Sequence, residues 1–404
     1  MSTNRVVVLL LANSGVVCGT HHREIMDAQT KLGVVLSVLV LLVVSLAAAR
    51  DPQEAMSATA RAYLDEVLGL MQREALHRDT IDWAQVRHET LVRATNAKTT
   101  LDTYPAIAYA LSQLQERHSS LDLPDSLPAK QKETIRAQMK KVAGTSRPPL
   151  DRSPFATRKE IEGHIDHLDG MSFAHLVVPM CVGQYTNEER NAAEFQQFAD
   201  KLHRLTVDLQ AQKPDSWIID LRGNLGGNMW PMLAGIGLVV GEGDLGSFQS
   251  PDGNNESWYY RAGKAGSRSH GQDSVGAQVT KPPFHLPQLP WVAVLLDRST
   301  ASSGEAIAIS FAGRPRSRSF GERTMGFATA NEENPLSDGA TLYLCSSVEA
   351  DRTGKRYEEG IDPDVVLPAP DHIPSEEQDA VLRAAEKWLL QEAVGHPMNS
   401  SPSA

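Results

Sequence analysis

The sequence predicts an α/β domain that follows a helical N-terminal region. Residues 56 to about 118 carry apolar side chains at three- and four-residue spacing, which is typical of helices with one buried face. From about residue 161, short apolar runs alternate with helical stripes, as in a sheet covered by helices. A chain of 404 residues with 41% hydrophobic and 22% charged residues is ordinary for a globular protein. We therefore expect one large or two ordinary folded domains.

Residues 1–50 are predicted to form an N-terminal extension with a targeting segment. Lys31 precedes an apolar run over 32–46, and three alanines at 47–49 then supply a cleavage site with small residues. We expect a secretory signal peptide and an exported protein, secreted or periplasmic. The alternative is a membrane anchor over 32–49, because the run approaches the roughly 18–20 apolar residues of a span. Met26 is well placed to be the initiator, so residues 1–25 are hypothesised to be an over-extended gene model.

The helical N-terminal domain is predicted over residues 56–121. Its first helix carries Tyr63, Leu64, Val67, Leu68 and Met71 on one face. Further helices are expected at 83–94 and 101–114. Residues 122–160 lose apolar periodicity and are rich in Pro, Lys, Arg, Ser and Gln, which predicts a linker or surface excursion.

The α/β core is predicted over residues 161–370. Strands are expected in "SFAHLVVPM", "SWIIDLRGN" and "PWVAVLLDR", and an amphipathic helix over 195–209. The segment "YYRAGKAGSRSHGQ" is interpreted as an exposed, flexible loop. A closing helix is predicted over 374–395, because Ser375 and Gln378 form a capping-box pattern ahead of an amphipathic stripe.

Charge and ligand-forming residues exclude several classes of function. The 39 Lys and Arg against 50 Asp and Glu disfavour nucleic acid as the main partner, because binders of nucleic acid usually carry a basic footprint. Cys18, Cys181 and Cys345 form no metal-ligand spacing. His164 and His167 in "GHIDH" have no third ligand near them in the sequence, so no metal site is predicted there.

Two turns carry residues suited to catalysis. In "GNLGGNMW", Gly226 and Gly227 follow a strand and are suited to aim main-chain N–H groups at a ligand, as in an oxyanion hole. A phosphate cradle is disfavoured, because neither nucleotide-binding glycine signature is present. In "TASSGE", Ser302 and Ser303 join a strand to a helix, where one serves either as a helix cap or as a nucleophile. Read alone, each turn is most simply structural.

Together with three later segments of the chain, the two turns form a series of motifs that resembles the series found in a known family. "DLRGNLGG", "VLLDRSTASSGEAIA", "SFGERTMG", "LSDGATLYL" and "GIDPDVVLP" occur in the order found in the tail-specific, or C-terminal processing, serine peptidases, a family that includes tricorn. The resemblance covers about residues 162–368. It implies a crotonase/ClpP-like α/β core, acyl-enzyme hydrolysis of peptide or protein substrates, and no cofactor. It also implies Ser302 as nucleophile, with the N–H of Ser303 and that of Gly226 or Gly227 as oxyanion donors.

The resemblance leaves the catalytic base to be identified. Phe327 occupies the position where the processing peptidases have a catalytic lysine, and the pKa of Arg323 is too high for a base. The tricorn-like branch uses a histidine and a later glutamate. That pattern points to His118 in "QERHSSL" and to Glu358 or Glu359 in "YEEG".

Two departures from the family remain. Arg117 stands where tricorn has a serine, and Ser119 is a weak substitute. Residues 122–160 are too few for the PDZ domain that processing peptidases usually carry, so capture of substrate C-termini by strand addition is not expected. The alternative function is a catalytically inactive binding protein for peptides or lipophiles on the same scaffold, because a fold does not fix a function.

Overall fold

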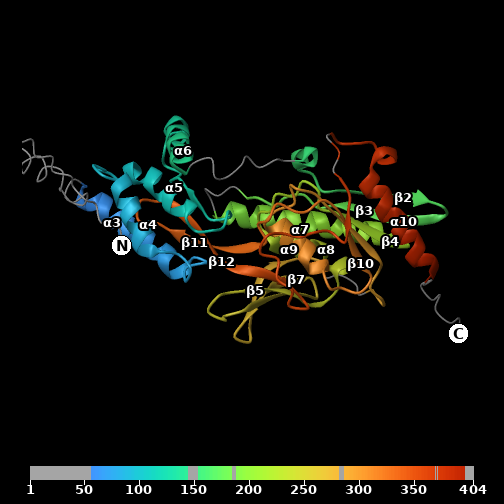
Figure 1. Cartoon of the computed structure of the whole chain (residues 1–404). Coiled ribbons are helices and arrows are strands. Elements are labelled where there is room, and N and C mark those ends of the chain that lie inside the picture. The colour runs from blue at the N-terminus through green and yellow to red at the C-terminus, as the bar shows by residue number, and fades with distance from the viewer. Residues whose placement is uncertain are drawn as a thin grey trace, which may run out of the picture.

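The computed structural model describes residues 56–143, 153–183, 188–281, 286–368, 370 and 372–395. The predicted signal peptide or anchor at 32–49, like Cys18, lies outside these residues. Within the described ranges, no helix combines the length and apolar character that a membrane span requires. Figure 1 shows a helical region at the N-terminal end, a core built on sheets, and helix α10 at the far end.

The N-terminal region is helical, as predicted. It contains α3 (Ala58–Glu74), α4 (Trp83–Arg93), the short η1 (Leu101–Thr103) and α5 (Tyr104–Ser112). The predicted face of α3 is buried, and Ser57 caps the helix by accepting from Ala60 N at 3.1 Å. This helical core also buries Leu342 and Leu344 of strand β12 (Thr341–Asp351), so it packs directly on the remainder of the protein.

The stretch 122–160 is more ordered than its composition predicts. It includes α6 (Ala129–Ala143), which packs beside α5, and the short η2 (Pro154–Thr157). The helix escapes sequence analysis because Ile135 and Met139 are among its few apolar contacts with the helical core. Residues 144–152, which belong to the same predicted linker or surface excursion, lie outside the described residues.

A six-stranded sheet forms the centre of the core, in the order β13-β10-β9-β4-β3-β2. Its strands are β2 (Glu162–Leu168), β3 (Met171–Val177), β4 (Ser216–Asp220), β9 (Val292–Leu296), β10 (Ser317–Gly321) and β13 (Val365–Val366). Neighbouring strands pair in parallel, except that β2 pairs antiparallel with β3. Every residue of β4 and β9 is buried, as in parallel strands covered on both faces.

Helices cover both faces of this sheet. On one face lie α7 (Glu188–Ala211), α8 (Met229–Val240) and α9 (Ser303–Phe311), which share a core with Leu176, Ile219 and Val294. On the other face lies α10 (Ala380–Gly395), which packs on Phe173 and Ile218 (Figure 1). The α/β architecture predicted from alternating elements is therefore present.

A second, antiparallel sheet follows the order β1-β12-β5-β6-β7-β8, and β11 also pairs with β12. Its other strands are β1 (Ser120–Asp122), β5 (Gly243–Gln249), β6 (Glu256–Arg261), β7 (Lys264–Ser269), β8 (Gln272–Gln278) and β11 (Thr329–Pro335). The prediction of a flexible loop at "YYRAGKAGSRSHGQ" is wrong, because this segment forms β7 and parts of β6 and β8. Tyr259 and Tyr260 within it are buried.

The closing helix begins later than its sequence pattern suggests. Ser375 precedes only the short η3 (Glu376–Gln378) and makes no side-chain capping bond. Asp379 instead accepts from Val381 N at 3.1 Å and Leu382 N at 3.0 Å. The helix is therefore capped by an aspartate four residues after the predicted serine.

Candidate active site

The two turns singled out in the sequence lie side by side. They follow β4 and β9, which are neighbouring parallel strands, so both turns emerge at the same edge of the sheet. Thr300 Oγ1 donates to Leu221 O at 3.0 Å and accepts from Asp297 N at 3.1 Å. Ala301 N donates to Asn224 O at 2.9 Å. These bonds fix the serine turn against the glycine turn.

Asp297 and Asn224 complete this framework with buried side chains. Asp297 Oδ1 accepts from Gly223 N at 3.0 Å and Ser299 N at 2.9 Å, so one carboxylate organises both turns. Asn224 Nδ2 donates to Val178 O at 3.0 Å, which anchors the glycine turn to the end of β3. Burial raises the pKa of Asp297, an effect that its hydrogen bonds oppose.

Ser302 lies at the N-cap of α9 in a strained backbone conformation. Its φ is 52° and its ψ is −124°, a region that non-glycine residues rarely adopt. Such strain persists where the surroundings enforce it, and it concentrates at functional sites. A serine on a sharp turn from strand to helix is the geometry by which hydrolases expose a nucleophilic hydroxyl.

Main-chain donors border this serine. A Cβ on Gly226 would lie 2.8 Å from Ser302 Cβ, so only glycine permits the approach of the two turns. Gly226 N already donates to Asn224 Oδ1 at 2.9 Å. Within the described part of the chain, the N–H groups of Gly227 and Ser303 donate to no other residue. The N–H of Gly227 is therefore available to a ligand, whereas that of Gly226 is already used within the turn.

Glu305, in the first turn of α9, fixes the serine turn through hydrogen bonds to main-chain N–H groups. Its Oε2 accepts from Ser302 N and Phe327 N, both at 2.8 Å. Its Oε1 accepts from Gly326 N at 3.0 Å and Thr324 Oγ1 at 2.5 Å. Burial raises the pKa of this carboxyl to about 7, although these donors favour its charged form. Sequence analysis missed Glu305, although its position three residues after Ser302 is the capping-box signal.

His118 reaches the site from the segment between α5 and β1. Its Nδ1 lies 2.9 Å from Thr329 Oγ1 on β11, and its ring stacks on Phe327 with centroids 5.0 Å apart. Burial lowers the pKa of His118 to about 4, although Glu116 opposes this shift. The imidazole is therefore neutral at neutral pH, the state in which it can accept a proton.

Ser302 and His118 are linked through shared neighbours. Phe327 stacks on the histidine, and its N–H donates to Glu305, which also holds the N–H of Ser302. The described residues include no direct hydrogen bond between the two side chains. Catalytic hydrogen bonds of this kind often tighten only when substrate is bound.

The structure does not bring the predicted glutamates to His118. Glu358 Oε1 lies 3.0 Å from His77 Nε2, and Glu359 lies 3.4 Å from Arg323 on an exposed loop. The partner of the imidazole is Thr329, which sequence analysis missed because it lies 211 positions away. Ser119 is also turned from the site, since its Oγ accepts from Cys345 N at 2.8 Å.

The remaining cysteines give no sign of a reactive site. Cys181 and Cys345 are buried free thiols. Burial raises the pKa of both, to about 12 for Cys181, so neither is a thiolate at neutral pH.

Comparison with known proteins identifies a peptidase family and a curated relative. Residues 187–367 match the model of peptidase family S41. The nisin-resistance protein of Lactococcus lactis subsp. lactis is 25% identical over 305 residues, which are 75% of this chain and 82% of that protein.

Solved structures share the fold. A lipoprotein from Streptococcus agalactiae superposes with a TM-score of 0.58 at 20% identity, covering 83% of this chain and 98% of that one. The photosystem II D1 C-terminal processing protease superposes with a TM-score of 0.51 at 15% identity, covering 81% and 98%. Residues 187–367 thus match peptidase family S41, and the chain is a serine-type peptidase.

Proposed function

We propose that Ser302 is the nucleophile of this peptidase and His118 its general base. The carrying observation is the backbone of Ser302, held at a φ of 52° beside the N–H groups of Gly227 and Ser303. A serine at the start of a helix also gains from the helix dipole when negative charge develops nearby. This arrangement is that of an acyl-transfer site with an oxyanion hole.

The contact of His118 with Thr329 supports a role as general base. When Nδ1–H donates to Thr329 Oγ1, the lone pair of Nε2 is left to accept the proton of Ser302 as its Oγ attacks the peptide carbonyl. The carbonyl oxygen becomes an oxyanion between the N–H groups of Gly227 and Ser303. His118 then returns the proton to the leaving amine, and water hydrolyses the acyl-enzyme. In this scheme a threonine orients the imidazole where tricorn-like peptidases use a glutamate.

The substrate is proposed to be a peptide with cationic character. The net charge of −11 favours approach of positively charged peptides. The similarity to the nisin-resistance protein, over 82% of that protein's length, makes nisin the first substrate to test. We also propose that the core is of the crotonase/ClpP type and belongs to the tricorn-like branch, which the order of strands in its sheets supports. We further propose export through residues 32–49, because residues 31–49 resemble a signal peptide.

A fluorophosphonate probe tests the catalytic assignment directly. We expect covalent labelling at Ser302, located by mass spectrometry, which disappears in Ser302→Ala and falls strongly in His118→Ala. Ser346→Ala, outside the site, serves as the control variant. Cleavage of nisin by the wild type and not by Ser302→Ala would establish the substrate. A folded wild-type protein that is not labelled at Ser302 would instead favour the binding-protein alternative.

A further inference from the structure

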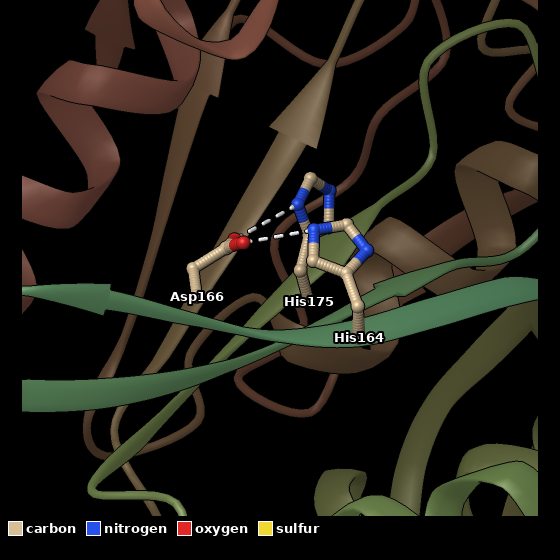
Figure 2. A group of neighbouring side chains, drawn as sticks. All are labelled: His164, Asp166 and His175. Carbon is tan, nitrogen blue, oxygen red and sulfur yellow. Dashed lines mark ion pairs between the residues drawn. The ribbon is translucent and has the colours of Figure 1, made fainter.

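A group of ligand-forming side chains lies on the edge hairpin of the six-stranded sheet, away from Ser302. His164 and Asp166 are two positions apart on β2, so they share one face of the strand. His175 on β3 pairs in register with His164 and therefore lies on that same face. Figure 2 shows the carboxylate of Asp166 directed at both imidazole rings.

The distances within this group suit a common ligand. Asp166 Oδ1 lies 2.8 Å from His164 Nε2, and Asp166 Oδ2 lies 3.4 Å from His175 Nδ1 (Figure 2). One ligand atom from each residue lies within 4.8 Å of the others. A tetrahedral zinc site with bonds of about 2.0–2.2 Å has its ligand atoms roughly 3.3–3.6 Å apart. Small rotations of His164 and Asp166 therefore suffice to form the site.

The buried member of the group has unsatisfied polar atoms. His175 is 5% exposed, and its ring nitrogens make no hydrogen bond in the described structure, only longer ion-pair contacts with Asp166 at 3.4 Å and Asp220 at 3.5 Å. Asp166 Oδ2 is also buried without a hydrogen bond. Groups of this kind are rare in folded proteins and require an explanation such as a bound ion. Here His175 Nδ1 and Asp166 Oδ2 face each other at 3.4 Å without a hydrogen bond.

The surroundings of His175 match the outer shell of a metal site. Its second nitrogen, Nε2, lies 3.5 Å from Asp220 Oδ2. A histidine that binds metal usually directs its other ring nitrogen at a carboxylate, which fixes the ring and increases its basicity. Asp220 is itself held by Arg222 and Arg158, both at 2.7 Å. The carboxylate is therefore rigid before any ligand binds.

Local charge also favours a cation. Glu376 Oε1 of η3 lies 3.4 Å from His164 Nε2, on the open side of the group. The carboxylates of Asp166 and Glu376 thus both contact His164. Both carboxylates attract a cation.

We propose that His164, Asp166 and His175 bind one divalent transition-metal ion, with zinc as the best match. Two imidazoles and one carboxylate suit zinc and disfavour magnesium or calcium, which prefer oxygen ligands. Glu376 or water completes the coordination. The sequence prediction considered His164 with His167, but His167 lies on the opposite face of β2. The missing ligands come from Asp166 and from the next strand.

The role of this site is structural. The ion joins the edge strand β2 to β3 and, through Glu376, to the segment that precedes α10. Through His175 and Asp220 it also reaches Arg222, whose Nη1 donates to Asp379 at 2.6 Å, the cap of α10. The ion therefore secures α10 and the edge hairpin on one face of the sheet.

Metal binding to the chelator-treated protein tests the proposal. Zn²⁺ is titrated by calorimetry, and Co²⁺ by the visible absorption bands that mark tetrahedral coordination. The variants are His164→Ala, which removes a half-exposed ligand at little risk to folding, and Asp166→Asn. His167→Ala on the same strand is the matched control. Fluorophosphonate labelling of Ser302 and circular dichroism report the fold of each variant.

We expect one Zn²⁺ per chain, with an affinity that falls by roughly 10–100-fold or more in His164→Ala and Asp166→Asn and is unchanged in His167→Ala. At 100-fold excess over the dissociation constant, Zn²⁺ should raise the Tm of the wild type by roughly 3–4 °C and that of His164→Ala by much less. Failure to bind Zn²⁺ or Co²⁺, or equal binding by wild type and His164→Ala, would overturn the proposal. Ser302 labelling should survive metal removal, which separates this test from that of the peptidase mechanism.

Discussion

The Thr300→Val variant tests whether the serine and glycine turns act as one unit. The hydroxyl of Thr300 bonds Leu221 O and Asp297 N, and all three residues are buried. Valine has the same shape but leaves Asp297 N without a partner, whereas Leu221 O still accepts from Asn224 N at 3.0 Å. A buried polar group left unsatisfied costs about 1–3 kcal/mol. We therefore expect the free energy of unfolding to fall by about 1–3 kcal/mol.

Thr206→Val is a matched control, because Thr206 is equally buried and lies in the α7–α8 contact, outside the serine and glycine turns. Its hydroxyl bonds Leu202 O at 2.9 Å and Gly235 O at 3.2 Å. Both are helical carbonyls that keep their helical donors. This variant should cost about 1 kcal/mol or less.

Urea unfolding of the two variants and the wild type measures the stability difference, and the rate of fluorophosphonate labelling measures the site. Thr300→Val should slow labelling of Ser302 at urea concentrations where the protein is still folded, whereas Thr206→Val should not. The reasoning fails if the two variants unfold with the same midpoint. It fails equally if Thr300→Val is labelled at the wild-type rate.

Three further predictions concern the base, the oxyanion hole and the glutamates. Because the pKa of His118 is lowered to about 4, protonation of the base should abolish labelling only as pH falls through about 4, and not near 6.5. Phe327→Ala should move that midpoint of the pH profile upward, since it exposes the stacked imidazole to water. In Gly227→Ala the new Cβ lies 2.0 Å from Cys181 O, at a position where φ is +103°. The N–H of residue 227 must then shift, which should slow labelling by about 10²–10³-fold. Circular dichroism checks that the variant is folded. Glu358→Gln and Glu359→Gln should be labelled nearly as fast as the wild type, because neither carboxylate contacts His118; a large loss in either variant would restore that glutamate to the mechanism.

Elements with a strong local pattern were predictable from the sequence. The stripes of α3 and α7 and the apolar runs of β4 and β9 appear where they were expected. These elements are buried on a long face or on all sides, so the spacing of their apolar residues shows which positions are buried.

Elements whose burial depends on distant partners were not predictable. Strand β8 contains Gly276, where a Cβ would lie 2.3 Å from the ring of Trp230 on α8, and its exposed polar residues resemble a loop. The same limit applies to the active site. Ser302 is marked by its own turn, whereas the contact of His118 with Thr329 joins two segments that no local pattern relates.

The strand that follows His118 has a consequence for which parts of the chain the proposed site requires. β1 adds to β12 with Leu121 opposite Leu342, directly beside the base, and Asn331 of β11 bonds His118 O at 3.4 Å. The proposed base is thus held by two strands, β11 and β12, that follow the proposed nucleophile in the sequence. A chain truncated before β11 would therefore keep Ser302 but lose the residues that hold His118.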